Sequence, residues 1–125
     1  MNENHPVKFS RCNLFQLEMR SVVAHEGQGF IDTCRLAAKD SLDGNCNFID
    51  FTKMPPGTEI GLHTHADNEE EFYLIISGSG LMHNENETFE VQPGDFVRNP
   101  PGGTHSLKNT GEKDLSLFVF EVSVS

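Results

Sequence analysis

Turn signals rich in glycine and proline interrupt this chain at short intervals, and they constrain its fold more than any other feature. Short apolar runs lie between them, and none shows a 3.6-residue apolar period long enough for a sizeable helix. Short strands separated by regular turns are typical of a β-sandwich or β-barrel. The sequence therefore predicts an all-β protein with little helix. The turn signals include Asp43-Gly44, Pro55-Pro56-Gly57, Ser77-Gly78-Ser79-Gly80, Pro93-Gly94 and Pro100-Pro101-Gly102-Gly103.

The 125 residues are enough for one domain with its own core and too few for two, so we expect a single domain over residues 1–125. Residues 1–13 are polar, and we expect a flexible arm or a swapped strand there. We expect residues 66–70, which include Glu69 and Glu70, to form a solvated loop. The expected strands are 14–23 at an edge, 30–37, 48–54, 71–76, a hairpin of 81–85 with 87–91, 96–99 and 115–122.

The run 71–76 is apolar on both faces of the expected strand, because both its odd and its even positions carry large apolar side chains. A strand that is apolar on both sides must be covered on both sides. If Glu71 and Tyr73 face a barrel interior, Phe72 and Leu74 need another layer. The N-terminal strands or a second subunit can supply that layer. We expect a homodimer.

The formal net charge is −10, from 19 acidic and 9 basic residues. This balance disfavours nucleic acid and anionic membranes as partners, because both require a basic surface. No apolar run approaches the roughly 20 residues of a membrane span, and no signal-peptide core follows the polar N-terminus. Cys12, Cys34 and Cys46 are odd in number and have no metal-binding spacing, which favours free thiols and a cytoplasmic location.

Two histidines near the middle of the chain are the first candidates for chemistry. His63 and His65 are two residues apart, so on an extended strand both imidazoles leave the same face. Glu71 opens the next apolar run, and His105 is a further candidate downstream. Imidazoles and a carboxylate that converge from neighbouring strands can form a divalent-metal site.

The residues around these candidates resemble the two motifs of the cupin superfamily. The first motif places Gly57 five residues before His63-Thr64-His65, followed by Glu71 and, six residues later, Gly78. The second motif runs from Gly94 through Pro100-Pro101-Gly102 and His105 to Asn109, and fifteen residues separate the two motifs. The resemblance implies a double-stranded β-helix, or jelly-roll barrel. It also implies one metal ion held by His63, His65, Glu71 and His105.

The spacing departs from the family pattern at one point. Five residues separate His65 from the glutamate, where the motif has three or four. Glu69 or Glu70 would satisfy the loop spacing, whereas Glu71 satisfies the spacing to Gly78. Strand register is rigid while a loop accommodates an extra residue at little cost, so we choose Glu71 as the ligand and keep Glu70 as the alternative.

Three imidazoles and one carboxylate suit one divalent transition metal, namely Fe, Mn, Ni, Zn, Co or Cu, rather than Ca or Mg. Tyr73 shares the inward face with Glu71 and is our candidate catalytic acid or base, with packed core as the alternative. His83 and Arg98 are weaker candidates, for a proton carrier and a substrate clamp, with exposed surface positions as alternatives. His5 and His25 lie outside the motifs, and we expect both to be solvent-exposed.

The resemblance implies a metal-dependent enzyme of dioxygenase, isomerase, lyase or decarboxylase type that acts on a small polar molecule. A thiol dioxygenase fits less well, because that group resembles a three-histidine site and Glu71 is present here. The alternatives are a metal-containing barrel that binds or senses a small ligand without turnover, and a dimeric barrel whose metal only links strands. Residues outside the ligand set decide between these functions, and none of them forms a signature.

Overall fold

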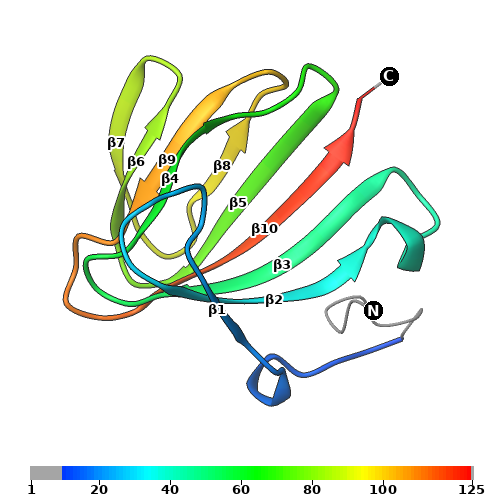
Figure 1. Ribbon diagram of the computed structural model, residues 1–125, viewed down its shortest axis with the longest axis horizontal. Helices are drawn as coiled ribbons and strands as arrows, with labels where there is room; N and C mark the ends of the chain where they lie inside the picture. Colours follow the sequence, from blue (N-terminus) through cyan, green and yellow to red (C-terminus); the bar gives the residue numbers. More distant parts are fainter. Residues whose placement is uncertain (1–9, 125) are drawn as a thin grey trace.

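The computed structural model describes residues 10–124, and nearly all of its regular structure is β. Figure 1 shows the strands in chain order, and the short 3-10 helices η1 (Leu14–Gln16) and η2 (Lys39–Ser41) are the only helical elements within these residues. The strands are β1 (Arg20–Val22), β2 (Ile31–Ala38), β3 (Cys46–Met54), β4 (Glu59–Thr64), β5 (Glu69–Ser77), β6 (Gly80–Asn84), β7 (Glu87–Val91), β8 (Phe96–Asn99), β9 (Thr104–Lys108) and β10 (Leu115–Ser123).

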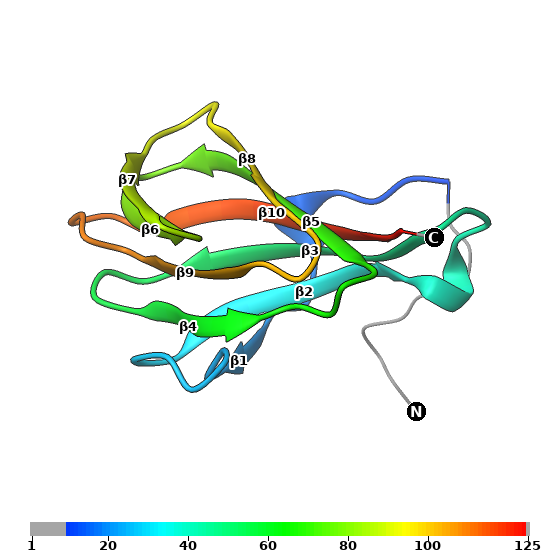
Figure 2. The ribbon, with the colours of Figure 1, turned by 90° about the horizontal axis from the view of Figure 1, so that it is seen from above.

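The strands form two antiparallel sheets. One has six strands in the order β1-β2-β3-β10-β5-β8, and the other has four in the order β4-β9-β6-β7. Figure 2 shows them as two layers, with β4, β9 and β6 facing the larger sheet. An apolar cluster that contains Met54, Ile75, Met82, Leu107 and Leu117 lies between them. The predicted all-β jelly-roll barrel is confirmed.

Alternation along β5 and β10 determines what faces this interior. Glu71, Tyr73 and Ile75 are buried, whereas the intervening Phe72 and Leu74 are half-buried on the outer face. On β10, Leu115 and Leu117 are fully buried and point the same way as Val119 and Glu121. A buried aliphatic side chain contributes about 1.5–3 kcal/mol, so this inner row stabilises the fold while it carries polar groups at one end.

The N-terminal segment differs from the single edge strand predicted for 14–23. The side chain of Asn13 accepts a hydrogen bond from the backbone N–H of Phe15, which favours the turn of η1, and only the three residues of β1 pair with β2. β1 and β2 extend the larger sheet sideways and do not supply the second layer considered for the outer face of β5. Of the predicted arm 1–13, residues 1–9 lie outside the described residues, and 10–13 are exposed.

The loop predicted at 66–70 is also wrong in its second half. The backbone N–H of Glu69 donates to the carbonyl of Ala66 at 3.1 Å, and β5 begins there, so Glu69 and Glu70 belong to the strand. The hairpin predicted around Glu85 is confirmed, with that residue at φ 57° in the turn between β6 and β7. Within the described residues, no helix is long and apolar enough to cross a membrane.

Candidate metal centre

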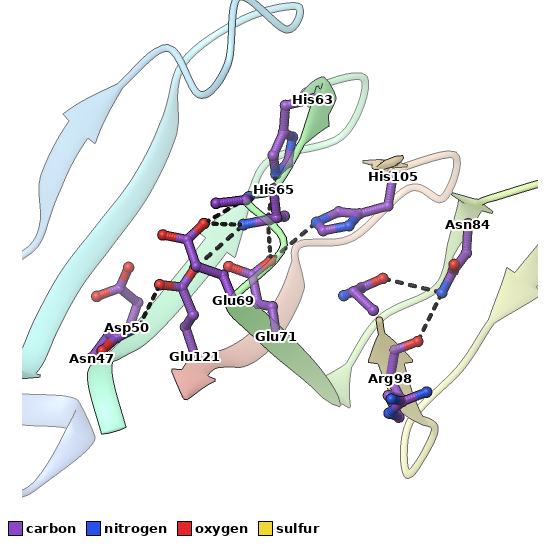
Figure 3. A network of polar contacts seen from close by, with 12 residues as sticks. Asn47, Asp50, His63, His65, Glu69, Glu71, Asn84, Arg98, His105 and Glu121 are labelled. Atoms are coloured by element: carbon purple, nitrogen blue, oxygen red, sulfur yellow. Dashed lines mark hydrogen bonds and ion pairs between the residues drawn. The ribbon is translucent and has the colours of Figure 1, made fainter. Parts of the chain in front are cut away.

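Four side chains converge inside the barrel. Three come from the strands β4, β5 and β9, and the fourth comes from the residue directly after β4. His63 on β4 and His105 on β9 are directly paired across the smaller sheet, His65 follows β4, and Glu71 comes from β5 of the larger sheet. Figure 3 shows them pointing toward one another. One donor atom from each lies within 4.8 Å of the others. The structure therefore brings together the four residues that the sequence analysis selected, with Glu71 and not Glu70 as the carboxylate.

A β-bulge in β4 aims His63 into the barrel. Ile60 pairs with Leu107 and His63 with His105, so β4 takes three steps where β9 takes two. Simple alternation from the buried Ile60 would turn His63 outward, and the extra residue reverses this. Gly61 occupies the bulge because a Cβ there would lie 2.1 Å from the carbonyl oxygen of His25, which crosses over the strand.

Hydrogen bonds fix the orientation of two of the imidazoles. Nδ1 of His63 lies 2.7 Å from the carbonyl oxygen of Gly61, which makes Nδ1 the protonated nitrogen and leaves Nε2 as the lone-pair donor. Nδ1 of His65 lies 3.3 Å from Oε1 of Glu121 and 3.4 Å from Oε1 of Glu69. Asn47 in turn donates to Oε2 of Glu121 at 2.9 Å. Such partners of a ligating histidine raise its basicity and hold its ring in place.

His105 is the most deeply placed of the three histidines, with 1% of its surface exposed. Its Nε2 lies 3.0 Å from Oε1 of Glu71, and its buried Nδ1 has no hydrogen-bond partner within residues 10–124. Packing therefore holds this ring, with Tyr73 edge-on at 5.4 Å between ring centroids.

The donor atoms have the spacing that a common metal ion requires. The Nε2 atoms of His63 and His65 are 3.2 Å apart, and Oε1 of Glu71 lies 3.2 Å from Nε2 of His65 as well as 3.0 Å from that of His105. Two donors at right angles, each about 2.1 Å from one ion, are about 3.0 Å apart. Three neutral imidazoles and one carboxylate are suitable ligands for a divalent transition metal, so these residues fit the group that the resemblance implies.

The charges of these groups in the metal-free protein differ sharply. Burial, partly offset by the hydrogen bond to Gly61, lowers the pKa of His63 to about 4. The hydrogen bonds to Glu121 and then Glu71 raise the pKa of His65 to about 10. Burial alone would raise the pKa of Glu71, but hydrogen bonds from His105 and His65 outweigh it and lower that pKa to about 2. The metal-free centre therefore holds an imidazolium at His65 between two carboxylates.

Tyr73 lies on the wall of this centre, with 2% of its surface exposed. Burial, and then the charge of Glu71, raises the pKa of its phenol well above the ordinary value. A phenol that keeps its proton can donate a hydrogen bond or a proton but is a poor base. Tyr73 also belongs to the apolar cluster of the barrel, so its position agrees with the packed-core alternative.

A cavity of about 240 Å³ adjoins the cluster, and His63, Glu71 and Tyr73 form part of its wall. Its lining also includes residues of β1, β2 and β3, among them Arg35 and Asp50, which belong to the same sheet as Glu71 and Tyr73. Pockets for drug-sized ligands span about 300–1,000 Å³, so this cavity suits a smaller molecule.

Three other predicted candidates lie away from the cluster. Glu70 points to the outer face of β5, where it forms an ion pair with Arg98. Glu70 therefore lies away from the metal cluster, and Arg98 forms the surface ion pair that was its alternative to a substrate clamp. His83 lies on the outward side of β6 and is 3.2 Å from the hydroxyl of Thr88. The predicted exposed residue His5 lies outside the described residues.

The sequence analysis missed His25, Glu121 and Arg35 as parts of this region. His25 is exposed as predicted, yet its ring stacks on that of His63, with centroids 3.5 Å apart and planes 6° from parallel. Its φ of 50° and the φ of 58° at Glu26 place the turn in a sparsely populated conformation, a feature that clusters at functional sites. Glu121 was within reach of sequence reasoning, because it shares the inward alternation of Leu117 and Val119 on β10.

Fold and cluster together define a small β-barrel with a candidate metal centre. The chain belongs to the cupin family, whose Cupin domain matches residues 50–121. It is 33% identical over 92 residues to the oxalate-binding protein of Thermotoga maritima, across 74% of this chain and 75% of that one. A solved structure from Thermotoga maritima, named a predicted oxalate decarboxylase, matches with a TM-score of 0.88 at 25% identity, over 92% of this chain and 100% of that chain. The chain is also 28% identical over 97 residues to 5-nitrosalicylic acid 1,2-dioxygenase of Bradyrhizobium, of which it spans 44%.

Proposed function

We propose that the protein is a metal-dependent enzyme that acts on a small carboxylic acid bound in the 240 Å³ cavity. The observation that carries this proposal is the convergence of three imidazole nitrogens and one carboxylate oxygen beside that cavity, all within 4.8 Å of one another and three of the pairs 3.0–3.2 Å apart. The names of two relatives, an oxalate-binding protein and a predicted oxalate decarboxylase, favour a short carboxylate as the ligand. Decarboxylase or other lyase chemistry is therefore favoured over dioxygenase and isomerase chemistry.

In this proposed function the residues of the site would have three roles: binding the metal, orienting its ligands and donating a proton. His63, His65, Glu71 and His105 would hold one divalent ion, whether Fe, Mn, Ni, Zn, Co or Cu. A bound ion of this kind supplies Lewis-acid or redox chemistry and attracts a carboxylate. Gly61 and Glu121 hold the imidazoles of His63 and His65 with Nε2 toward the centre. Tyr73, which keeps its proton, can donate it to a product carbanion or a departing group.

A barrel that binds a small acid without turnover is the second candidate. It is favoured by the name of the oxalate-binding relative. It is also favoured by the positions of His83 and Arg98, since the predicted proton carrier and the predicted substrate clamp both lie away from the metal cluster. Both candidates require the same metal and the same cavity, so product formation distinguishes them.

The first experiment is metal analysis by plasma mass spectrometry, followed by incubation of the metal-loaded protein with oxalate. We expect about one equivalent of metal, and release of carbon dioxide and formate that is lost on chelation and reduced in Tyr73→Phe. Oxalate that binds to the loaded protein but is not consumed would support the binding barrel. Metal-free protein that takes up none of the six ions would contradict both candidates.

We further propose that a second copy of the chain covers the outer face of the larger sheet. Phe72, Phe96 and Phe120 stack there with centroids 5.4–6.0 Å apart, and Phe96 is 57% exposed. Exposed apolar patches of this kind mark interaction sites. We expect sedimentation equilibrium at micromolar concentrations to give twice the chain mass, and Phe96→Glu to shift it toward one chain mass. A wild-type monomer at these concentrations would contradict the proposal.

The proposed location is the cytoplasm. Cys12, Cys34 and Cys46 are all free, and burial raises the pKa of the Cys34 and Cys46 thiols. Unpaired thiols that keep their protons are typical of proteins in a reducing compartment. Fractionation of expressing cells would test this location.

A further inference from the structure

Two arginines line the cavity, Arg20 on β1 and Arg35 on β2, and hydrogen bonds hold Arg35 in a fixed orientation. Arg35 on β2 is directly paired with Asp50 on β3, and both line the cavity, three and two strands away from Tyr73 in the same sheet. Its Nε donates to Oδ1 of Asp50 at 2.8 Å and its Nη2 donates to Oδ2 at 3.0 Å. The guanidinium carbon also lies 4.3 Å from the centre of the Phe48 ring. The two parallel hydrogen bonds and the ring fix the guanidinium plane before any ligand arrives.

Most of the hydrogen-bonding capacity of Arg35 remains available. A guanidinium has five N–H donors, and Asp50 takes two of them. Within residues 10–124 no other acceptor of an Arg35 hydrogen bond is found, which leaves three donors for solvent or a ligand. The Arg35 side chain is 36% exposed, and a planar guanidinium with unused donors at the wall of a small cavity can bind a carboxylate through two parallel hydrogen bonds.

The register of the larger sheet places Arg35 across the cavity from the metal centre. Arg35 pairs with Asp50, Asp50 with Val119, and Val119 with Tyr73. The adjacent row of the same sheet pairs Glu121 with Glu71. Three strand spacings of about 4.8 Å separate β2 from β5, so the two backbones lie about 14 Å apart along the sheet. Arg35 and Glu71 reach into the cavity from opposite ends.

Regular alternation along β2 turns Arg35 toward the cavity together with Ile31 and Thr33, and a bulge follows directly after it. Arg35 pairs with Asp50 but Ala37 pairs with Ile49, so β2 takes two steps where β3 takes one. Bulges of this kind change the direction of the side chains that follow them and are frequent near active sites. The bulge directly after Arg35 ends the regular alternation of β2 at the cavity wall.

We propose that Arg35 binds the second acid group of the ligand, so that the natural ligand is a small acid with two carboxylates, one at the metal centre and one on Arg35. This inference rests on the proposed function, because it requires the ligand to occupy the cavity beside the metal. A monocarboxylate would use only the metal centre, and its affinity would not depend on Arg35. Arg35 is thus a specificity-determining residue that the cupin motifs do not contain.

Calorimetric titration with oxalate, malonate and acetate tests this assignment on the wild type, Arg35→Lys and Arg35→Gln. We expect Arg35→Gln to weaken oxalate or malonate binding by roughly 10- to 100-fold, the range for a lost charge-assisted hydrogen-bond pair, and to leave acetate binding within about twofold. Arg35→Lys keeps the charge but loses the two-pronged geometry, so we expect an intermediate loss. Arg98→Gln is the matched control, because it removes an arginine that is paired with a glutamate on the opposite face of the sheet.

Metal content is measured before and after each titration, because a dicarboxylate can strip the ion, and circular dichroism checks the fold of each variant. Full metal occupancy with equal dicarboxylate affinity in the wild type and both Arg35 variants would overturn the role of Arg35 and leave the proposed function intact. A wild type that binds neither metal nor dicarboxylate would overturn both. Equal losses in Arg35→Gln and Arg98→Gln would also overturn it, because they would point to net charge instead of the cavity.

Discussion

Replacing His105 with alanine is expected to reduce metal affinity by at least about 100-fold. Loss of a partner that only orients a ligand costs about 10- to 100-fold, and His105 itself provides one of the four donor atoms. The ring is 1% exposed, so its removal leaves a buried cavity, and a water that enters this cavity is a weaker ligand than an imidazole. Plasma mass spectrometry after desalting measures the retained metal directly.

The same substitution should lower the melting temperature of the loaded protein by roughly 10 °C. An ion present at about 100 times its dissociation constant stabilises the folded state by about 2.7 kcal/mol, and for a chain of this size each kcal/mol is worth several degrees. Chelated wild-type protein provides the reference, because it lacks the metal but keeps the packing of His105. Any loss beyond that reference measures the cavity left by the imidazole.

Glu70→Ala is the matched control for this experiment. Glu70 is adjacent to Glu71 on β5 but points to the outer face, where its ion pair with Arg98 is worth about 0–1 kcal/mol. We expect metal content to be unchanged in Glu70→Ala and strongly reduced in Glu71→Ala. The opposite result would mean that the register of β5 is shifted by one residue and that Glu70 is the ligand.

The inward face of the larger sheet could be predicted from the sequence because its strands alternate regularly. The apolar run after Glu71 fixes which residues share the face of Tyr73, and the glycine at position 78 fixes where the strand ends. The choice of Glu71 over Glu70 followed from that rigid register, even though the preceding turn holds one residue more than the motif allows.

Bulges explain much of what could not be predicted. The bulge in β4 reverses the alternation between Ile60 and His63. A second bulge lies in β3, where Phe48 pairs with Glu121 and Cys46 with Val122. Asn47 is the extra residue of this bulge and donates a hydrogen bond to Glu121. A bulge depends on the pairing partner as well as on the strand itself, so the pattern of one segment does not reveal it.

The remaining surprises come from strands outside the two motifs. Arg35 and His25 belong to β2 and to the turn before it, and their contacts with the cavity or the centre arise only when β2 joins β3 and the turn crosses Gly61. Neither residue has a spacing in the sequence that relates it to His63 or Glu71. Long-range pairing, and not local pattern, brings them to the site.

Metal binding at pH 8 is expected to release about one proton, which comes from His65. Glu121 and Glu71 are directly paired on β10 and β5, and the imidazole of His65 bridges them at 3.3 Å and 3.2 Å. These contacts raise the pKa of His65 to about 10, so the ring is an imidazolium in the metal-free protein at pH 8. A metal ion needs the lone pair of Nε2 and displaces that proton, whereas Nδ1–H remains on Glu121.

The sign of the pH dependence follows from the same pKa values. His65 stabilises the metal-free fold fully below its unfolded pKa of about 6.5, and this contribution is lost as pH rises toward 10. Glu71 acts at the other end, since its contribution is present above about 4.5 and is lost as pH falls toward 2. Metal affinity should therefore increase by about tenfold per pH unit between pH 7 and 9, where one proton competes with the ion.

Calorimetric metal titrations in buffers of different ionisation enthalpy count the released protons. Glu121→Gln provides the matched variant, because the amide can still contact Nδ1 of His65 but no longer favours the imidazolium. We expect this variant to release fewer protons at pH 8 and its metal affinity to depend less steeply on pH. At pH 9 we expect it to bind metal about 10- to 100-fold more weakly, because its His65 is less basic without the Glu121 carboxylate. If Glu121→Gln releases as many protons as the wild type, the proton does not come from His65, and the bridge between the two carboxylates does not control the charge of the centre.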